Sequence, residues 1–207
     1  SRAPSVCPGE QVALKLVHSH LLEQKVSLKR FLREVEIGKT IRHPNVVPTY
    51  DAGVHVRKGQ YLHYLVMEYV EGQTLRSLLA ELGRVPEVLC RHIAREVTQG
   101  LAAIHAAGAV HRDLKPENVL ITRDEVVKVM DLGVALVQAQ TLRLSQSGLF
   151  IGSVLYAAPE QLGRLPGVAV GPHSDIYGLG KTFCYALFKT TQPLPRHWRG
   201  LPGELAA

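Results

Sequence analysis

Cysteine is scarce in this sequence, and its placement argues against a disulfide scaffold. The 207 residues include three cysteines, Cys7, Cys90 and Cys184, which lie far apart and form no Cys-x-x-Cys pair. An odd, widely spaced set of this kind indicates reduced thiols rather than an even disulfide framework. This pattern favours an intracellular protein.

Long apolar runs are absent as well. No segment approaches the roughly 18 consecutive apolar residues of a membrane span, and the start of the chain, 1–4, lacks the apolar core of a secretion signal. We therefore expect a soluble, cytoplasmic chain without a membrane segment. With 46% hydrophobic and 20% charged residues, the chain can bury a sizeable core, which argues against wholesale disorder.

The charge balance is basic but not concentrated. Lys and Arg number 24 against 18 Asp and Glu, a formal net charge of +6, yet only short pairs such as Lys29-Arg30 occur. No basic run is interleaved with aromatic residues, so nucleic acid is not a predicted partner. A partner that carries phosphate remains open.

Hydrophobic periodicity changes about a third of the way along the chain. Strands are predicted at 11–17, 46–56 and 61–67, with a helix around 28–35; helices are predicted at 75–82, 86–105 and 175–187, with a hairpin of strands 118–122 and 126–130. An irregular stretch follows at 131–160, which is too long for a passive connector. This pattern predicts an α+β fold with two lobes, a small β-rich one within 1–69 and a larger helical one within 70–207, with a hinge at 70–73. The helix at 175–187 is apolar on most sides and is expected to be buried in the middle of the larger lobe.

A polar string separates the long helix from the hairpin. It reads His111-Arg112-Asp113-Leu114-Lys115-Pro116-Glu117-Asn118. The plain alternative is a polar turn between a helix and a strand. The string resembles the catalytic loop of eukaryotic-type Ser/Thr protein kinases, the bacterial members included. The resemblance implies that Asp113 is the base or orienter of the acceptor hydroxyl, that Lys115 contacts the γ-phosphate and that Asn118 is a Mg²⁺ ligand.

Two further motifs occur in the order expected for that family. Asp131-Leu132-Gly133 is similar to the metal-binding Asp-Phe-Gly segment and follows the second hairpin strand, 13 residues after Asn118. Alone it would be read as a turn; within the resemblance, Asp131 is the second Mg²⁺ ligand. Val12-Ala13-Leu14-Lys15 resembles the strand whose lysine contacts the α- and β-phosphates, and Glu34 would hold Lys15 in an ion pair.

The resemblance also implies an adenine pocket. Ala13 and Leu120 would form its apolar roof and floor, Met67 would be the gatekeeper, and the Glu68 carbonyl with the Val70 backbone would meet the purine edge. The alternative is that these are ordinary core residues.

The long loop ends in a segment, 152–160, that is similar to the kinase segment cradling the acceptor residue. Ser153 stands there in place of the usual Thr. Thr141, Ser145 and Ser147 are candidate sites of autophosphorylation within 131–160, with Arg112 as the cation that would pair with the phosphate. Asp175 resembles the helix residue that anchors the backbone of the catalytic loop, which would be a structural role.

The sequence departs from the family pattern near both ends. No Gly-x-Gly-x-x-Gly loop precedes Lys15, where Gly9 is the only glycine, and the arginine that pairs with the family equivalent of Glu160 has no counterpart after it. We interpret the chain as a kinase domain truncated at both ends. We expect exposed apolar surface on the small-lobe sheet and on the larger lobe as a result.

The function implied by the resemblance is transfer of the ATP γ-phosphate to Ser/Thr hydroxyls of proteins, with ATP and Mg²⁺ as cofactors. The alternative is a catalytically impaired, kinase-like nucleotide-binding or scaffold module. Small-molecule phosphotransfer of the aminoglycoside type is less favoured, because Lys115 and the segment ending at Glu160 point to a protein acceptor.

Overall fold

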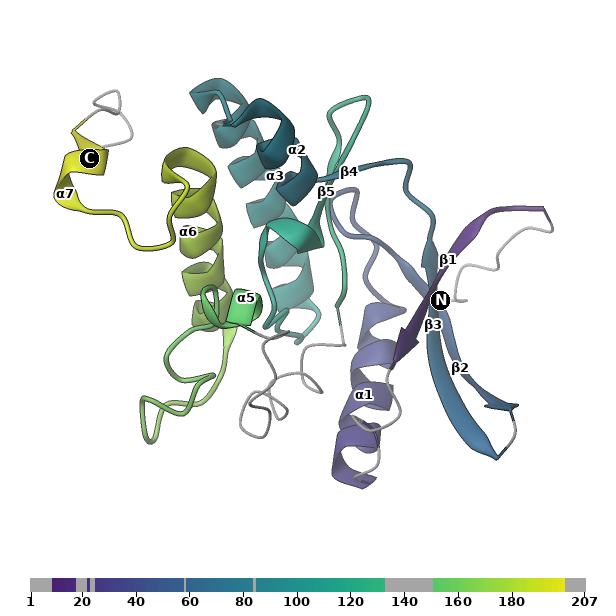
Figure 1. Cartoon of the computed structure of the whole chain (residues 1–207). Coiled ribbons are helices and arrows are strands. Elements are labelled where there is room, and N and C mark those ends of the chain that lie inside the picture. Colours follow the sequence, from purple (N-terminus) through teal and green to yellow (C-terminus); the bar gives the residue numbers. More distant parts are fainter. Residues whose placement is uncertain are drawn as a thin grey trace.

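The computed structural model describes residues 9–17, 22, 25–57, 59–83, 85–132 and 151–199 of the chain. In chain order the elements are β1 (Val12–Val17), α1 (Lys25–Gly38), β2 (Thr49–Arg57), β3 (Gln60–Glu68), β4 (Gly72–Thr74), α2 (Leu75–Leu82), α3 (Glu87–Ala106), the 3-10 turn η2 (Pro116–Asn118), β5 (Val119–Thr122), β6 (Val127–Val129), α5 (Ile151–Val154), α6 (Pro172–Phe188) and α7 (Pro195–Trp198). A small sheet with α1 lies on one side of the molecule and a mostly helical part lies on the other (Figure 1). This is the α+β arrangement expected from the sequence.

The small sheet is antiparallel, with strand order β1-β3-β2. One face is covered by α1, where Phe31 and Val35 pack with Val17 and Leu65 in a buried cluster. The other face is open, since Leu14 and Leu16 of β1 are each 65% exposed. The period-2 alternation of the strand thus puts alternate residues in the core and in solvent.

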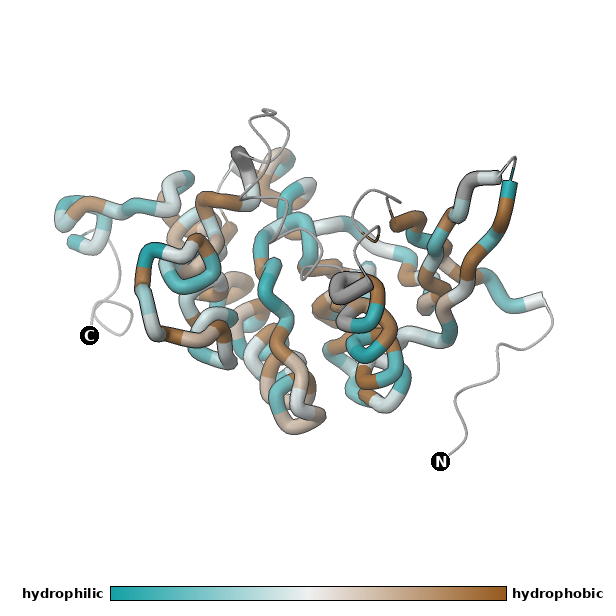
Figure 2. Tube along the Cα trace, turned by 90° about the horizontal axis from the view of Figure 1, so that it is seen from below, coloured by the Kyte–Doolittle hydropathy of each residue, from teal (hydrophilic) through white to brown (hydrophobic). Residues whose placement is uncertain are grey.

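The larger core lies between α2, α3, α6 and the second sheet, whose order is β4-β5-β6. Ile93, Val97, Leu101 and Ile104 form the buried stripe of α3, as their helical spacing predicts. Seen nearly end-on, the helices carry hydrophobic residues on one part of their circumference and hydrophilic residues on the rest (Figure 2).

The short helix α2 begins and ends where its sequence signals predict. The Ser77 amide donates to Thr74 Oγ1 at 3.1 Å, and Gly83 takes a φ of +71° at the carboxyl end. Thr74 is a side-chain cap for an amide that has no partner within the helix, and glycine adopts a positive φ without steric cost.

Several elements differ from the sequence-based prediction. Gly72–Thr74, which overlaps the hinge predicted at 70–73, forms strand β4 and pairs with β5; three residues are too few to show a period-2 pattern. The short helix α5 lies within 131–160, where an irregular stretch was predicted. Helix α6, predicted to be buried in the middle of its lobe, buries one face that includes Asp175, Gly178 and Thr182. On its other side Ile176 is 52% exposed, because the described elements cover only one face.

Cys90 and Cys184 are free thiols, as predicted, while Cys7 lies outside the described residues. Burial raises the pKa of the Cys90 thiol to about 11, so it is a core residue and not a reactive one. Among the helices that the structure describes, none has the length and apolar character needed to cross a bilayer.

Candidate active site

The polar string at 111–118 connects α3 to β5 and is held by a buried histidine. His111 is 0% exposed. Its Nδ1 accepts from the Asp113 amide at 3.3 Å, and its Nε2 lies 2.8 Å from the Met130 carbonyl oxygen. An acceptor at Nδ1 requires the proton on Nε2, so the neutral Nε2–H tautomer satisfies both contacts. The loop is thereby tied to the residue that precedes Asp131.

Asp175 anchors the same loop from α6, which confirms its predicted structural role. Its carboxylate accepts from the His111 amide at 2.8 Å and from the Arg112 amide at 2.7 Å, and His105 Nε2 lies 2.7 Å from it. Arg112 has a φ of +67°, a conformation that disfavours residues with a Cβ. The two amide bonds to Asp175 help to offset the cost of that backbone.

The catalytic candidates of the loop lie together. Asp113 Oδ2 accepts from Lys115 Nζ at 2.7 Å and from Asn118 Nδ2 at 3.0 Å. Asn118 Nδ2 also donates to the Asp113 carbonyl at 2.7 Å, and Lys115 Nζ donates to Ser153 Oγ at 2.8 Å. A carboxylate, an ammonium, an amide and a hydroxyl therefore converge at one point. That combination is suited to positioning an acceptor hydroxyl and a phosphoryl group.

The segment 152–160 is joined to the loop by a second set of bonds. Gln161 Nε2 donates to the Arg112 carbonyl at 2.7 Å, and the Ala158 amide donates to Gln161 Oε1 at 3.0 Å. Glu160, expected to lack its family partner, is buried and accepts from Ser174 Oγ, with His173 Nε2 at 3.4 Å. Burial opposes the ionised form, but the Ser174 hydrogen bond, a backbone hydrogen bond and the nearby His173 together outweigh it and lower the pKa of Glu160.

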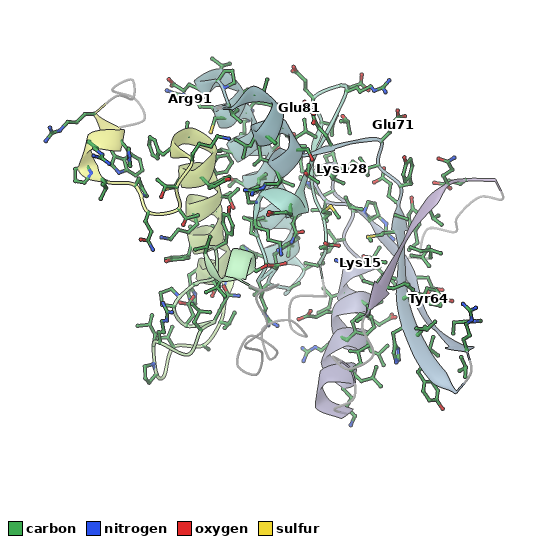
Figure 3. All side chains as sticks on the ribbon, in the orientation of Figure 1. Lys15, Tyr64, Glu71, Glu81, Arg91 and Lys128 are labelled. Atoms are coloured by element: carbon green, nitrogen blue, oxygen red, sulfur yellow. The ribbon has the colours of Figure 1, made fainter. Side chains whose placement is uncertain are left out.

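The expected ion pair between Lys15 and Glu34 is replaced by two others. Lys15 Nζ lies 2.6 Å from Asp131 Oδ2, and Arg112 Nη1 lies 3.0 Å from Glu34 Oε1. Figure 3 shows Lys15 at the junction of the small sheet and the helical part. The two cations and the two carboxylates balance in charge whether Lys15 pairs with Asp131 or with Glu34. Charge balance therefore does not select the pairing, which follows from the distances that the position of α1 sets.

The donor set at this junction fits Mg²⁺. Asp131 Oδ1 is buried and has no hydrogen-bond partner among the residues that the structure describes, and carboxylate and amide oxygens are the ligands that this ion prefers. Both side-chain hydrogen bonds that the structure gives Asn118 are donated by Nδ2, an orientation that leaves Oδ1 available to a metal ion. Asp131 has a φ of +72°, a conformation that usually signals a functional or tightly held position.

The adenine candidates come from both sheets. Ala13 and Met67 are directly opposite in the β1–β3 ladder, and Met67 is 9% exposed. Leu120 is half-buried on β5, opposite Thr74 of β4. Val70 lies in the connection between β3 and β4. The candidate roof residue and the candidate gatekeeper therefore lie in one sheet, and the candidate floor residue lies in the other.

Sequence reasoning did not identify Lys128, which pairs with Glu68 at 2.6 Å, or Gln161, which holds the Arg112 carbonyl. A lysine at an alternating position of a short strand carries no signal that separates it from a solvent-facing residue. Of the predicted residues, Gly133, Thr141, Ser145 and Ser147 lie outside the described part of the chain.

Comparison with known proteins agrees with this geometry. Residues 4–199 match the family described as "Protein kinase domain". The chain is 36% identical over 169 residues to serine/threonine-protein kinase PknB of Mycobacterium leprae, which covers 82% of this chain and 27% of that protein. It is also 36% identical over 179 residues to serine/threonine-protein kinase PknA of Corynebacterium glutamicum, covering 86% of this chain and 37% of that protein.

A probable serine/threonine-protein kinase of Streptomyces coelicolor matches at 36% identity, over 83% of this chain and 25% of that protein. The chain therefore spans between a quarter and two fifths of the length of these relatives. The family match covers most of the chain, and the catalytic-loop string lies within it. On these grounds the chain belongs to the protein kinase family.

Proposed function

We propose that the chain is a protein kinase domain, with its small lobe within 1–69 and its larger lobe within 70–207, that transfers the γ-phosphoryl group of ATP to Ser or Thr hydroxyls of proteins. The observation that carries the proposal is the convergence of Lys115, Asn118 and Ser153 on or beside Asp113. The names of the relatives as serine/threonine-protein kinases support the same acceptor class.

Within this proposal each polar side chain has one task. Asp113 accepts the proton of the substrate hydroxyl and orients its oxygen toward the phosphorus. Lys115, 2.7 Å from Asp113, neutralises charge on the transferring group, while Lys15 contacts the α- and β-phosphates. Phosphoryl transfer depends mainly on positioning and charge neutralisation, which these side chains supply.

Asn118 and Asp131 would hold Mg²⁺, which when bound offsets negative charge on the phosphates. The buried Oδ1 of Asp131, which has no hydrogen-bond partner within the described part of the chain, supports this assignment. Lys15 Nζ, 2.6 Å from Asp131 Oδ2, has to move from that oxygen to reach the phosphates.

The nucleotide base would lie between Ala13 and Leu120, beside Met67, with its polar edge toward the Glu68 carbonyl and the Val70 backbone. Because the reaction consumes ATP, we assign it to the cytoplasm. Autophosphorylation within 131–160, at Thr141, Ser145 or Ser147, stays part of the proposal. A phosphate on one of these residues would compete with the Glu34 carboxylate for an ion pair with Arg112.

The test is transfer of labelled γ-phosphate from Mg²⁺-ATP to the chain itself and to a generic basic protein, followed by identification of the labelled amino acid. Asp113→Asn is expected to reduce transfer by roughly 10²-fold or more, because general-base catalysis contributes about that much. Asp124→Asn, an exposed position on the β5–β6 turn, is the matched control and should transfer normally.

Label on phosphoserine or phosphothreonine that disappears in Asp113→Asn would support the proposal. Folded parent protein that binds ATP but transfers no label would contradict it and would favour a kinase-like binding module. A triple Ala variant at Thr141, Ser145 and Ser147 tests the proposed loop sites, because self-labelling should fall while labelling of the added protein continues.

A further inference from the structure

An ion pair joins the last residue of β3 to the second sheet. Lys128 Nζ of β6 lies 2.6 Å from Glu68 Oε2, and the two side chains are 15% and 29% exposed. The residues are 60 positions apart in sequence, and Lys128 lies at the junction of the two parts of the molecule (Figure 3). A charge-assisted bond this short between partly buried groups restrains both side chains.

The Glu68 peptide is restrained from its other side as well. Its amide donates to the Pro48 carbonyl at 3.1 Å, and the residue is paired with Val12 in the β1–β3 ladder. The amide and the side chain are both attached to the Glu68 Cα, and one is held by the small sheet while the other is held by β6. The carbonyl carbon is bonded to the same Cα, so its position is restrained by contacts with both parts of the molecule.

Lys128 also lies on the face of the second sheet that matters for the nucleotide. It is directly opposite Leu120 in the β5–β6 ladder, and residues directly opposite in a ladder share a face. The ammonium group thus approaches Glu68 from the face that carries the proposed floor of the adenine pocket.

We propose that Lys128 is a positioning residue for nucleotide binding, which holds the Glu68 carboxylate and so directs the Glu68 carbonyl at the base. A carbonyl accepts and does not donate, so the purine group it recognises is a donor, the 6-amino group of adenine. The pair therefore contributes to selection of adenine nucleotides. This inference rests on the proposed function, because that proposal brings the base to Glu68.

The experiment compares two nucleotides on matched variants. The dissociation constants of ATP and of purine riboside triphosphate, which lacks the 6-amino group, are measured with Mg²⁺ by calorimetry for wild type, Lys128→Met and Glu68→Gln. Arg123→Met is the control, since it removes a cation from the same hairpin whose partner, Glu71, is 3.4 Å away and well exposed.

For Lys128→Met and Glu68→Gln we expect the ATP dissociation constant to rise roughly threefold to tenfold, the range given by a partly buried ion pair. Binding of purine riboside triphosphate should change much less, and Arg123→Met should bind both nucleotides as wild type does. In steady-state transfer assays KM for ATP should rise while kcat is nearly unchanged. Exchanging the charges, Lys128→Glu with Glu68→Lys, should restore part of the ATP affinity.

Other outcomes separate this inference from the proposal beneath it. Unchanged ATP binding in Lys128→Met, or equal losses of affinity for the two nucleotides, would overturn the positioning role of Lys128. The proposed function would not be affected by that result as long as the wild-type protein binds ATP. Wild-type protein that is folded and binds neither nucleotide would overturn the proposed function and this role together.

Discussion

Arg112 Nη1 lies 3.0 Å from Glu34 Oε1, so the catalytic-loop segment holds helix α1 by an ion pair whose side chains are 21% and 14% exposed. The neighbouring pair, Lys15 with Asp131 at 2.6 Å, uses the other two charges of the cluster. The two pairs hold the small sheet and its helix to the larger lobe at the point where the proposed chemistry takes place.

The Arg112–Glu34 ion pair is expected to contribute to the free energy of unfolding. Replacing Arg112 by Met leaves a mostly buried carboxylate without this partner, which is expected to lower the free energy of unfolding by about 1–3 kcal/mol. Urea unfolding of Arg112→Met, Glu34→Gln and the double variant measures the coupling. The double variant should be less destabilised than the sum of the two single variants; strict additivity would contradict a direct interaction.

The anchor at Asp175 should be sensitive to loss of one carboxylate oxygen. Asp175→Asn keeps the size of the side chain but offers one neutral oxygen in place of two charged ones, so one of the two loop amides loses its acceptor in a site where the side chain is 0% exposed. We expect stability to fall by about 1–3 kcal/mol, and transfer activity to fall with it, because the His111 and Arg112 amides set the course of the loop. Chemical denaturation and transfer assays on the same preparation test this, and an active, fully stable Asp175→Asn protein would refute the anchoring role.

Two helical glycines should respond to Ala in opposite directions. A Cβ at Gly100 of α3 would come within 2.6 Å of the Asn45 carbonyl oxygen, whereas a Cβ at Gly180 of α6 would meet nothing within 4 Å. Gly180→Ala should therefore stabilise the fold by about 0.5–1 kcal/mol through helix propensity. Gly100→Ala should destabilise it by about 1–3 kcal/mol through overpacking. The denaturant concentrations at the unfolding midpoint of the two variants test these expectations. A more stable Gly100→Ala protein would contradict the close approach of residue 100 to the Asn45 carbonyl oxygen.

The lowered pKa of Glu160 predicts a pH dependence. Burial raises this pKa, but the hydrogen bond from Ser174, a backbone hydrogen bond and the nearby His173 together lower it by more, so the folded value lies below the unfolded one. The stabilisation is therefore complete above the unfolded pKa, near 4.5, and is lost as pH falls through the folded pKa. Glu160→Gln should be less stable than wild type at pH 7, and the difference should shrink toward pH 3. A difference that stays constant between these pH values in urea unfolding would contradict the linkage.

The local elements could be predicted from sequence because their signals are local. The Leu75–Leu82 helix, with Thr74 as its cap and Gly83 as its end, follows from residues within one turn of each boundary. The buried stripe of α3 follows from the spacing of its apolar side chains. Strand β4 was missed because three residues have no periodicity. The exposure of Ile176 was missed because apolar character on a helix does not say which elements cover it.

The identity of the site residues was likewise determined by the sequence, since Asp113, Lys115 and Asn118 occur in one short string. Their partners were decided only by tertiary structure. The sequence supplies two cations and two carboxylates whose charges balance in either pairing: Lys15, Arg112, Glu34 and Asp131. The placement of α1 brings Glu34 to Arg112 and not to Lys15. The pairing of Lys128 with Glu68 arises in the same way, because Coulomb energy depends on distances that only packing of the two sheets and α1 determines.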